Sequence, residues 1–102
     1  MLELRPICEN CATALPPSSS EAMICSYECT FCRDCVEGIL GNVCPNCGGG
    51  FEARPVRPAR AWREGVSLID DPASTTPKHR PVEPREHTTF AQVIRDIPAS
   101  ER

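Results

Sequence analysis

The sequence predicts a small metal-stabilised domain with one short central helix and minimal strands, followed by a proline-rich and largely extended tail. All eight cysteines of the 102-residue chain lie between Cys8 and Cys47. Apolar residues at helical spacing follow the third cysteine pair, and the composition changes sharply after the glycines at 48–50. We therefore expect a cysteine-rich module over residues 1–51 and a Pro/Arg-rich tail over residues 52–102.

The cysteines are expected to bind metal because nothing in the sequence points to an oxidising compartment. Residues 1–6, Met-Leu-Glu-Leu-Arg-Pro, lack the basic stretch and the continuous apolar run of a secretory signal. No run approaches the roughly 18 apolar residues that a membrane span requires. The expected location is the cytoplasm, where thiols stay reduced, and no membrane partner is expected.

The cysteines form four successive pairs with none left over: Cys8-x2-Cys11, Cys25-x3-Cys29, Cys32-x2-Cys35 and Cys44-x2-Cys47. The tight turn of a Cys-x2-Cys pair lets two sulfur atoms approach one ion at tetrahedral spacing, with Zn–S distances of about 2.3 Å. Eight thiolates therefore predict two structural Zn²⁺ ions as cofactors, each closed by four ligands.

A short helix is expected between the third and fourth pairs. Apolar residues at i, i+3 and i+4 predict a helix from about Asp34 to Leu40, and Gly41 and Asn42 are suited to end it. The positive N-terminal end of this helix would face the thiolates of the third pair. The helix also carries the chain about 10 Å onward before the fourth pair.

This displacement favours an interleaved arrangement of ligands. The first zinc would then be held by Cys8, Cys11, Cys32 and Cys35, and the second by Cys25, Cys29, Cys44 and Cys47. A sequential arrangement, in which the first four cysteines hold one ion and the last four hold the other, stays open.

Two family resemblances follow from these residues. The stretch from Cys25 to Val36 (Cys-Ser-Tyr-Glu-Cys-Thr-Phe-Cys-Arg-Asp-Cys-Val), followed by Cys44-Pro-Asn-Cys47, resembles the RING-type cross-brace zinc finger, a treble-clef-type fold. It departs from that pattern at Cys29, where the family usually has histidine. The segment 1–50 is also similar to a family of short bacterial cysteine-rich proteins known as domain of unknown function 1272, through Leu-Glu-Leu-Arg-Pro, Ala-Met-Ile-Cys-Ser and the run 29–35. This second resemblance implies a fold type and no activity.

No catalytic function is expected. RING-type ubiquitin ligases recruit their partner enzyme through an apolar residue after the first cysteine, a proline between the last two and often a basic residue after the final one. This chain has Glu9, Pro45 and Gly48 at these positions, so only the proline matches. A zinc ion with four thiolate ligands has no open position for water, and the two histidines, His79 and His87, lie in the tail, where we expect them to be solvated. We expect neither an enzyme nor a small-molecule substrate.

An iron–sulfur protein or a thiol redox sensor remains as an alternative. The run Cys29-x2-Cys32-x2-Cys35 begins like that of a bacterial ferredoxin, although Ile39 stands where the fourth cysteine belongs. Exposed zinc thiolates can also oxidise and release their ion.

Metal is expected to decide whether the module folds. The predicted core consists of nine apolar residues: Leu4, Ile7, Met23, Ile24, Phe31, Val36, Ile39, Leu40 and Phe51. A core of this size rarely supplies more than about 3–5 kcal/mol, whereas structural zinc contributes on the order of 10–16 kcal/mol per site.

The first candidate recognition element in the tail is a strip of arginines at every third position, with a tryptophan beside it: Arg54, Arg57, Arg60, Trp62 and Arg63. A polyproline II helix, with three residues per turn, would align these guanidinium groups along one edge. One interpretation is that the strip binds an acidic partner or nucleic acid. The other is that it lies against the acidic module or is simply solvated. Since residues 1–50 carry two basic and six acidic side chains, nucleic acid is the less expected partner.

The second element is a short amphipathic helix predicted near residues 89–97, with a capping box formed by Thr89 and Gln92. Its apolar face consists of Phe90, Val93, Ile94 and Ile97. A helix this short needs a surface to dock on, either the module of the same chain or a partner. The expected function is thus a non-catalytic zinc-binding adaptor whose partner is another protein, with a nucleic-acid-binding regulator as the third possibility.

Overall fold

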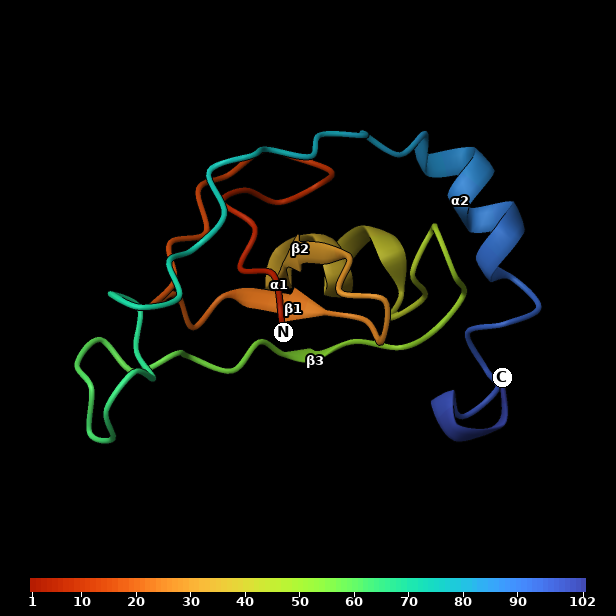
Figure 1. Ribbon diagram of the computed structural model, residues 1–102. Helices are drawn as coiled ribbons and strands as arrows, with labels where there is room; N and C mark the ends of the chain where they lie inside the picture. Colours follow the sequence, from red (N-terminus) through yellow and green to blue (C-terminus); the bar gives the residue numbers. More distant parts are fainter.

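The computed structural model describes residues 1–102 and shows a small three-stranded sheet, one short central helical segment and a long segment that wraps around them (Figure 1). The elements in chain order are β1 (Ala22–Ile24), β2 (Thr30–Cys32), α1 (Arg33–Cys35), the π-helix η1 (Val36–Leu40), β3 (Glu52–Ala53), α2 (Pro84–Ala91) and the 3₁₀-helix η2 (Ala99–Glu101). None of the helices has the length and apolar character that crossing a membrane would require.

The sheet has the strand order β2-β1-β3 and is antiparallel throughout. Met23 in β1 pairs with Phe31 in β2 on one side and with Ala53 in β3 on the other. The third strand comes from residues that the sequence placed in the tail. The module therefore continues past residue 51 and takes its closing strand from the chain beyond the glycine run.

The helix predicted from Asp34 to Leu40 is present, as α1 followed without a break by η1. Gly41 and Asn42 end it with left-handed backbone angles, φ of 60° and 58°, in agreement with their predicted role. The placement of Ile39 in the core was wrong, because its side chain is 42% exposed. A π-helix winds more slowly than an α-helix, so Leu40 lies over Val36 on the buried face and Ile39 moves off it.

The core combines apolar side chains with six of the cysteines. Phe31 and Phe51 meet edge to face at its centre, with ring centroids 5.4 Å apart and an interplanar angle of 78°. Leu15 and Val43 are fully buried although the sequence pattern did not indicate them. Leu15 is brought in by the pairing of its N–H with the carbonyl of Pro6, at 2.8 Å, a contact that no local periodicity signals.

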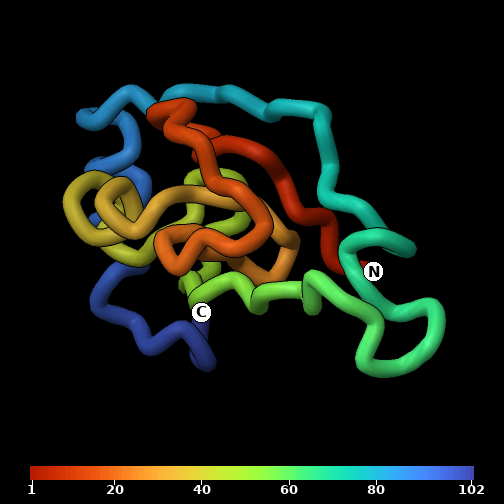
Figure 2. Tube along the Cα trace, turned by 90° about the vertical axis from the view of Figure 1, so that its left-hand side faces the viewer, coloured from red at the N-terminus to blue at the C-terminus, as the bar shows by residue number.

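The segment after β3 crosses the module and returns to it (Figures 1 and 2). The N–H of Ser74 donates to the carbonyl of Leu4 at 3.0 Å, and that of Arg80 donates to the carbonyl of Glu9 at 2.8 Å. The chain is irregular over residues 72–83, and backbone hydrogen bonds hold it against the N-terminal segment.

The helix predicted near residues 89–97 lies elsewhere, since α2 begins at Pro84 and ends at Ala91. Its N-cap is Glu83, whose carboxylate accepts from the N–H of Glu86 at 2.7 Å, and the proline at the first helical position needs no partner for its nitrogen. Thr89, expected to cap the helix, lies inside it and donates its hydroxyl to the carbonyl of Arg85 at 3.1 Å.

Candidate metal centres

The first centre brings together the first and third cysteine pairs. The sulfur atoms of Cys8, Cys11, Cys32 and Cys35 all lie within 4.8 Å of one another. The Sγ atoms of Cys11 and Cys32 are 3.7 Å apart. A tetrahedron with Zn–S bonds of about 2.3 Å has edges of about 3.8 Å, so this thiol pair already has the spacing that a tetrahedral ion requires.

Hydrogen-bond donors point at these sulfur atoms. The N–H of Cys11 donates to Sγ of Cys8 at 3.5 Å, and the side-chain amide of Asn10 donates to Sγ of Cys35 at 3.3 Å. Burial disfavours ionisation of Cys8, but backbone N–H groups, including that of Cys11, outweigh it and lower the pKa of this thiol. Burial raises the pKa of Cys32 and Cys35, and a metal ion would displace their protons.

The second centre contains three sulfur atoms within 4.8 Å of one another, those of Cys25, Cys44 and Cys47. Cys29 lies beside this group but outside that distance. Burial is the main cause that raises the pKa of Cys29, and the thiol of Cys25 adds to it, while Asn46 and Cys44 lower it. The four cysteines expected at the second zinc are thus neighbours, with three already gathered and the fourth adjacent to them.

The grouping of the sulfur atoms is interleaved, and β2 explains why. Cys29 directly precedes this strand and Cys32 ends it, so three residues of extended chain separate them by about 10 Å. The hairpin returns Cys25 to the side of Cys29, where its N–H donates to the Cys29 carbonyl at 3.2 Å. Neighbouring pairs in the sequence therefore face different centres.

A buried carboxylate connects the two centres. Glu9, which lies within the first cysteine pair, is 5% exposed, and its Oε1 accepts from the side-chain amide of Asn46, within the last pair, at 3.0 Å. Nε of Arg80 lies 3.8 Å from the same oxygen. Sequence reasoning missed Asn10 and Asn46, although a signal was present: both occupy the third position of a Cys-x2-Cys pair.

The arginine strip does not form a single binding edge. Arg54 is 4% exposed, and its guanidinium donates to the carbonyls of Arg5, Leu15 and Pro16 at 3.0, 3.2 and 2.9 Å. Burial lowers the pKa of this guanidinium. Its assignment as a partner-binding residue was wrong, because its N–H continues the sheet ladder and its side chain fills the module. Arg57 also turns inward, whereas Arg60, Trp62 and Arg63 remain exposed.

The predicted apolar face of the tail helix provides only part of its docking contacts, with the side chains of Phe90 and Ile94 beside Gly48 of the module. Phe90, Val93 and Ile97 are exposed and Ile94 is half-buried. The buried residues of α2 are His87 and Ala91. Nε2 of His87 donates to the carbonyl of Leu40, the last residue of η1, at 2.8 Å. The expectation of a solvated histidine was wrong here, and the helix docks on its own module.

We expect His87→Ala to release α2 from the module without unfolding it. The carbonyl of Leu40 loses the imidazole and keeps only the N–H of Val43, at 3.2 Å, so the loss of this one hydrogen bond should cost about 0.5–1.5 kcal/mol of docking free energy. Amide hydrogen exchange should become faster in residues 84–91 and stay unchanged in the strands. The exposed substitution Arg85→Ala is the matched control, and equal exchange in both variants would contradict a docking role for His87.

The cysteine-rich part of the chain is similar to proteins of one family. The family model described as "Protein of unknown function (DUF1272)" matches residues 1–57, which include both centres, β3 and Arg54. An uncharacterized protein of Rhizobium meliloti (strain 1021) is 63% identical over 59 residues, which cover 58% of this chain and 70% of that protein. No solved structure matches.

Proposed function

The chain belongs to the DUF1272 family of proteins of unknown function, and from that premise we propose that it is a non-catalytic protein-interaction or adaptor module, built as a RING-like, treble-clef-type finger around two structural zinc ions. The observation that carries this proposal is the gathering of four thiols within 4.8 Å, two of them at tetrahedral spacing, from pairs that are distant in the sequence. A cluster of this kind suits a soft, thiophilic cation.

The donor set determines what the metal would do. Cys8, Cys11, Cys32 and Cys35 would hold one ion, and Cys25, Cys44 and Cys47 would hold the other, with Cys29 as its fourth ligand. Four thiolates leave zinc no open position for water or substrate. The ions would therefore supply folding energy, and the protein would act through its surface in the reducing cytoplasm.

Metal analysis of the purified full-length protein tests this proposal. We expect two zinc ions per chain and a colourless solution. After exchange with ¹¹³Cd, Cys8→Ser and Cys32→Ser should perturb one cadmium resonance, and Cys25→Ser and Cys44→Ser the other. Perturbation of the same resonance by Cys8→Ser and Cys25→Ser would instead support sequential wiring.

A redox or sensor function is the second candidate, supported by one exposed thiol in each group, Cys11 and Cys47. Such thiols are accessible to oxidants. Brown protein that contains iron, or reversible zinc release at low peroxide concentration, would favour this function over a purely structural module.

A further inference from the structure

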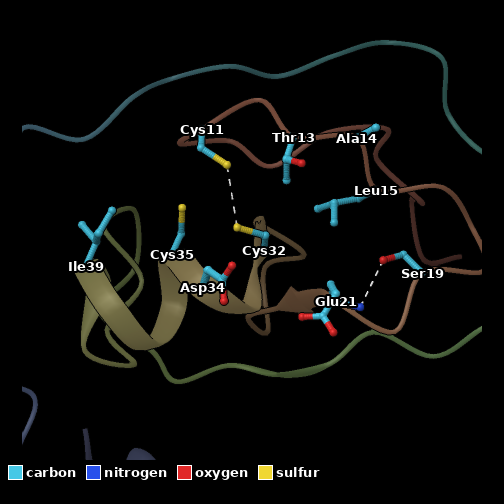
Figure 3. Close-up of a pocket in the computed structure, with 10 residues that line it drawn as sticks. All are labelled: Cys11, Thr13, Ala14, Leu15, Ser19, Glu21, Cys32, Asp34, Cys35 and Ile39. Carbon is cyan, nitrogen blue, oxygen red and sulfur yellow. Dashed lines mark hydrogen bonds between the residues drawn. The ribbon is translucent and has the colours of Figure 1, made fainter.

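A groove of about 450 Å³ lies beside the first cysteine group (Figure 3). It runs between the loop 11–19 and the face of α1 and η1. Ile39 lies at one end, Ala14 and Leu15 form an apolar wall, and the carboxylates of Glu21 and Asp34 lie along the opposite rim. The exposure of Ile39, which the core does not use, provides part of this apolar surface.

The groove is negative as well as apolar. No lysine or arginine lines it, and Asp34 has no basic side chain within ion-pair distance. Glu21 has a single ion-pair partner, Arg33, at 3.7 Å. Three cysteines of the first group form the base, and four thiolates around a divalent ion carry a net charge of −2. An occupant of this groove should combine an apolar anchor with positive charge.

A surface of that composition exists on the same chain. The loop 57–71 projects from one end of the molecule (Figures 1 and 2) and exposes Trp62, 75% accessible, together with Val66 and Ile69. The Arg60 guanidinium lies 5.3 Å from the centre of the Trp62 ring, a cation–π distance. Neither Arg60 nor Arg63 has a carboxylate partner. The loop therefore presents an aromatic anchor between two unpaired positive charges.

The base of this loop is fixed. Arg57 donates to the carbonyls of Leu2 and Asp71, both at 2.7 Å, and the N–H of Leu68 donates to the carbonyl of Pro58 at 2.8 Å. Within its own molecule Trp62 lies beside Met1 and Val66 and does not line the groove. Contact between the two complementary surfaces thus requires two molecules.

We propose that the groove beside the first cysteine group receives Trp62 from a second copy of this chain, with Arg60 and Arg63 facing Asp34 and Glu21. This inference rests on the proposed function, since the metal-bound cysteines form the base of the groove. Tryptophan and arginine are the residues that most often dominate binding energy at interfaces, and complementary charge sets the orientation of the partners. The partner of this adaptor surface is then another molecule of the same protein.

Sedimentation equilibrium of the zinc-loaded full-length protein tests the inference, from low micromolar concentration to about 0.5 mM. We expect concentration-dependent self-association that weakens between about 50 and 500 mM salt, because exposed charges are then screened. Trp62→Ala should weaken it at least tenfold. Val93→Ala, which truncates a side chain of equal exposure in the tail, should leave it unchanged.

Exchanging charges between the groove and the loop 57–71 tests how the two copies are oriented. Asp34→Lys and Arg63→Glu should each abolish self-association, and mixing the two variants should restore it. Because Asp34 lies within a cysteine pair, Glu21→Lys replaces it if Asp34→Lys loses metal. Arg85→Glu, on the exposed side of α2, is the charge control.

Failure of the self-association inference can be distinguished from failure of the proposed metal module. Zinc-loaded protein that stays monomeric throughout the range, or association that survives Trp62→Ala, overturns this inference and leaves the proposed metal module intact. Wild-type protein without two zinc ions, measured on the same sample, contradicts the proposed function itself.

Discussion

Removal of metal by a strong chelator is expected to abolish the tertiary structure of residues 1–57, because the two centres join segments that little else holds together. An ion in the first centre would tie the first cysteine pair to the end of β2 and the end of α1, and an ion in the second would tie the hairpin to the last cysteine pair. The strands that connect them are three, three and two residues long. Sheets this short are not stable by themselves.

The free energies involved predict that the tertiary structure is lost completely rather than partially. Structural zinc contributes on the order of 10–16 kcal/mol per site, whereas a core of this size supplies about 3–5 kcal/mol. Six of the core residues are themselves cysteines, so the metal-free chain would have to bury thiols that no longer bind anything.

The measurement is the dispersion of the amide NMR spectrum before and after metal removal under reducing conditions. Addition of zinc should restore the dispersed spectrum, and addition of magnesium, which prefers oxygen ligands, should not. A metal-free protein with undiminished dispersion would show that the core alone specifies the fold.

Substitution of Arg54 by alanine is expected to have the second largest effect, a loss of about 3 kcal/mol or more in the free energy of unfolding. The guanidinium donates to three backbone carbonyls; those of Arg5 and Leu15 have no other donor, whereas that of Pro16 also accepts from the N–H of Ser19. Hydrogen bonds to a charged group contribute about 1.5–3 kcal/mol, and acceptors left unpaired in a buried site add a desolvation cost. The truncation also leaves a cavity between β3 and the N-terminal loop.

Denaturant unfolding of the zinc-loaded protein would measure this loss. Arg63→Ala, which removes an exposed arginine from the same strip, should change stability by less than about 0.5 kcal/mol. Arg54→Lys should recover only part of the loss, because an ammonium group cannot reproduce the planar fork of a guanidinium. Equal stability of Arg54→Ala and Arg63→Ala would contradict a structural role for Arg54.

The features that the sequence predicted well are those with local signals. The helix after Cys32 follows from apolar spacing, and its end follows from Gly41 and Asn42, whose left-handed angles are local properties. The interleaved gathering of sulfur atoms could be anticipated because helix length sets how far the chain travels between pairs.

The features that could not be predicted from the sequence depend on contacts between segments that are separated along the chain. The burial of Leu15 depends on a hydrogen bond to Pro6, and that of Arg54 on three carbonyls that precede it by 38 to 49 positions. For α2 a local signal existed, since a proline is typical of the first position of a helix and Pro84 occupies it. The apolar spacing of residues 90–97 favoured a later start, but α2 ends at Ala91, and Val93 in that pattern is 76% exposed.

The position of Arg54 in the chain sets an order of events during synthesis. On the ribosome all eight thiols emerge before this arginine, which follows the last cysteine by only a few residues. Metal capture can therefore begin on a nascent chain whose sheet still lacks β3. With zinc bound as proposed, the guanidinium would close the module over segments that the ions have already drawn together, and ligation would precede the final folding step.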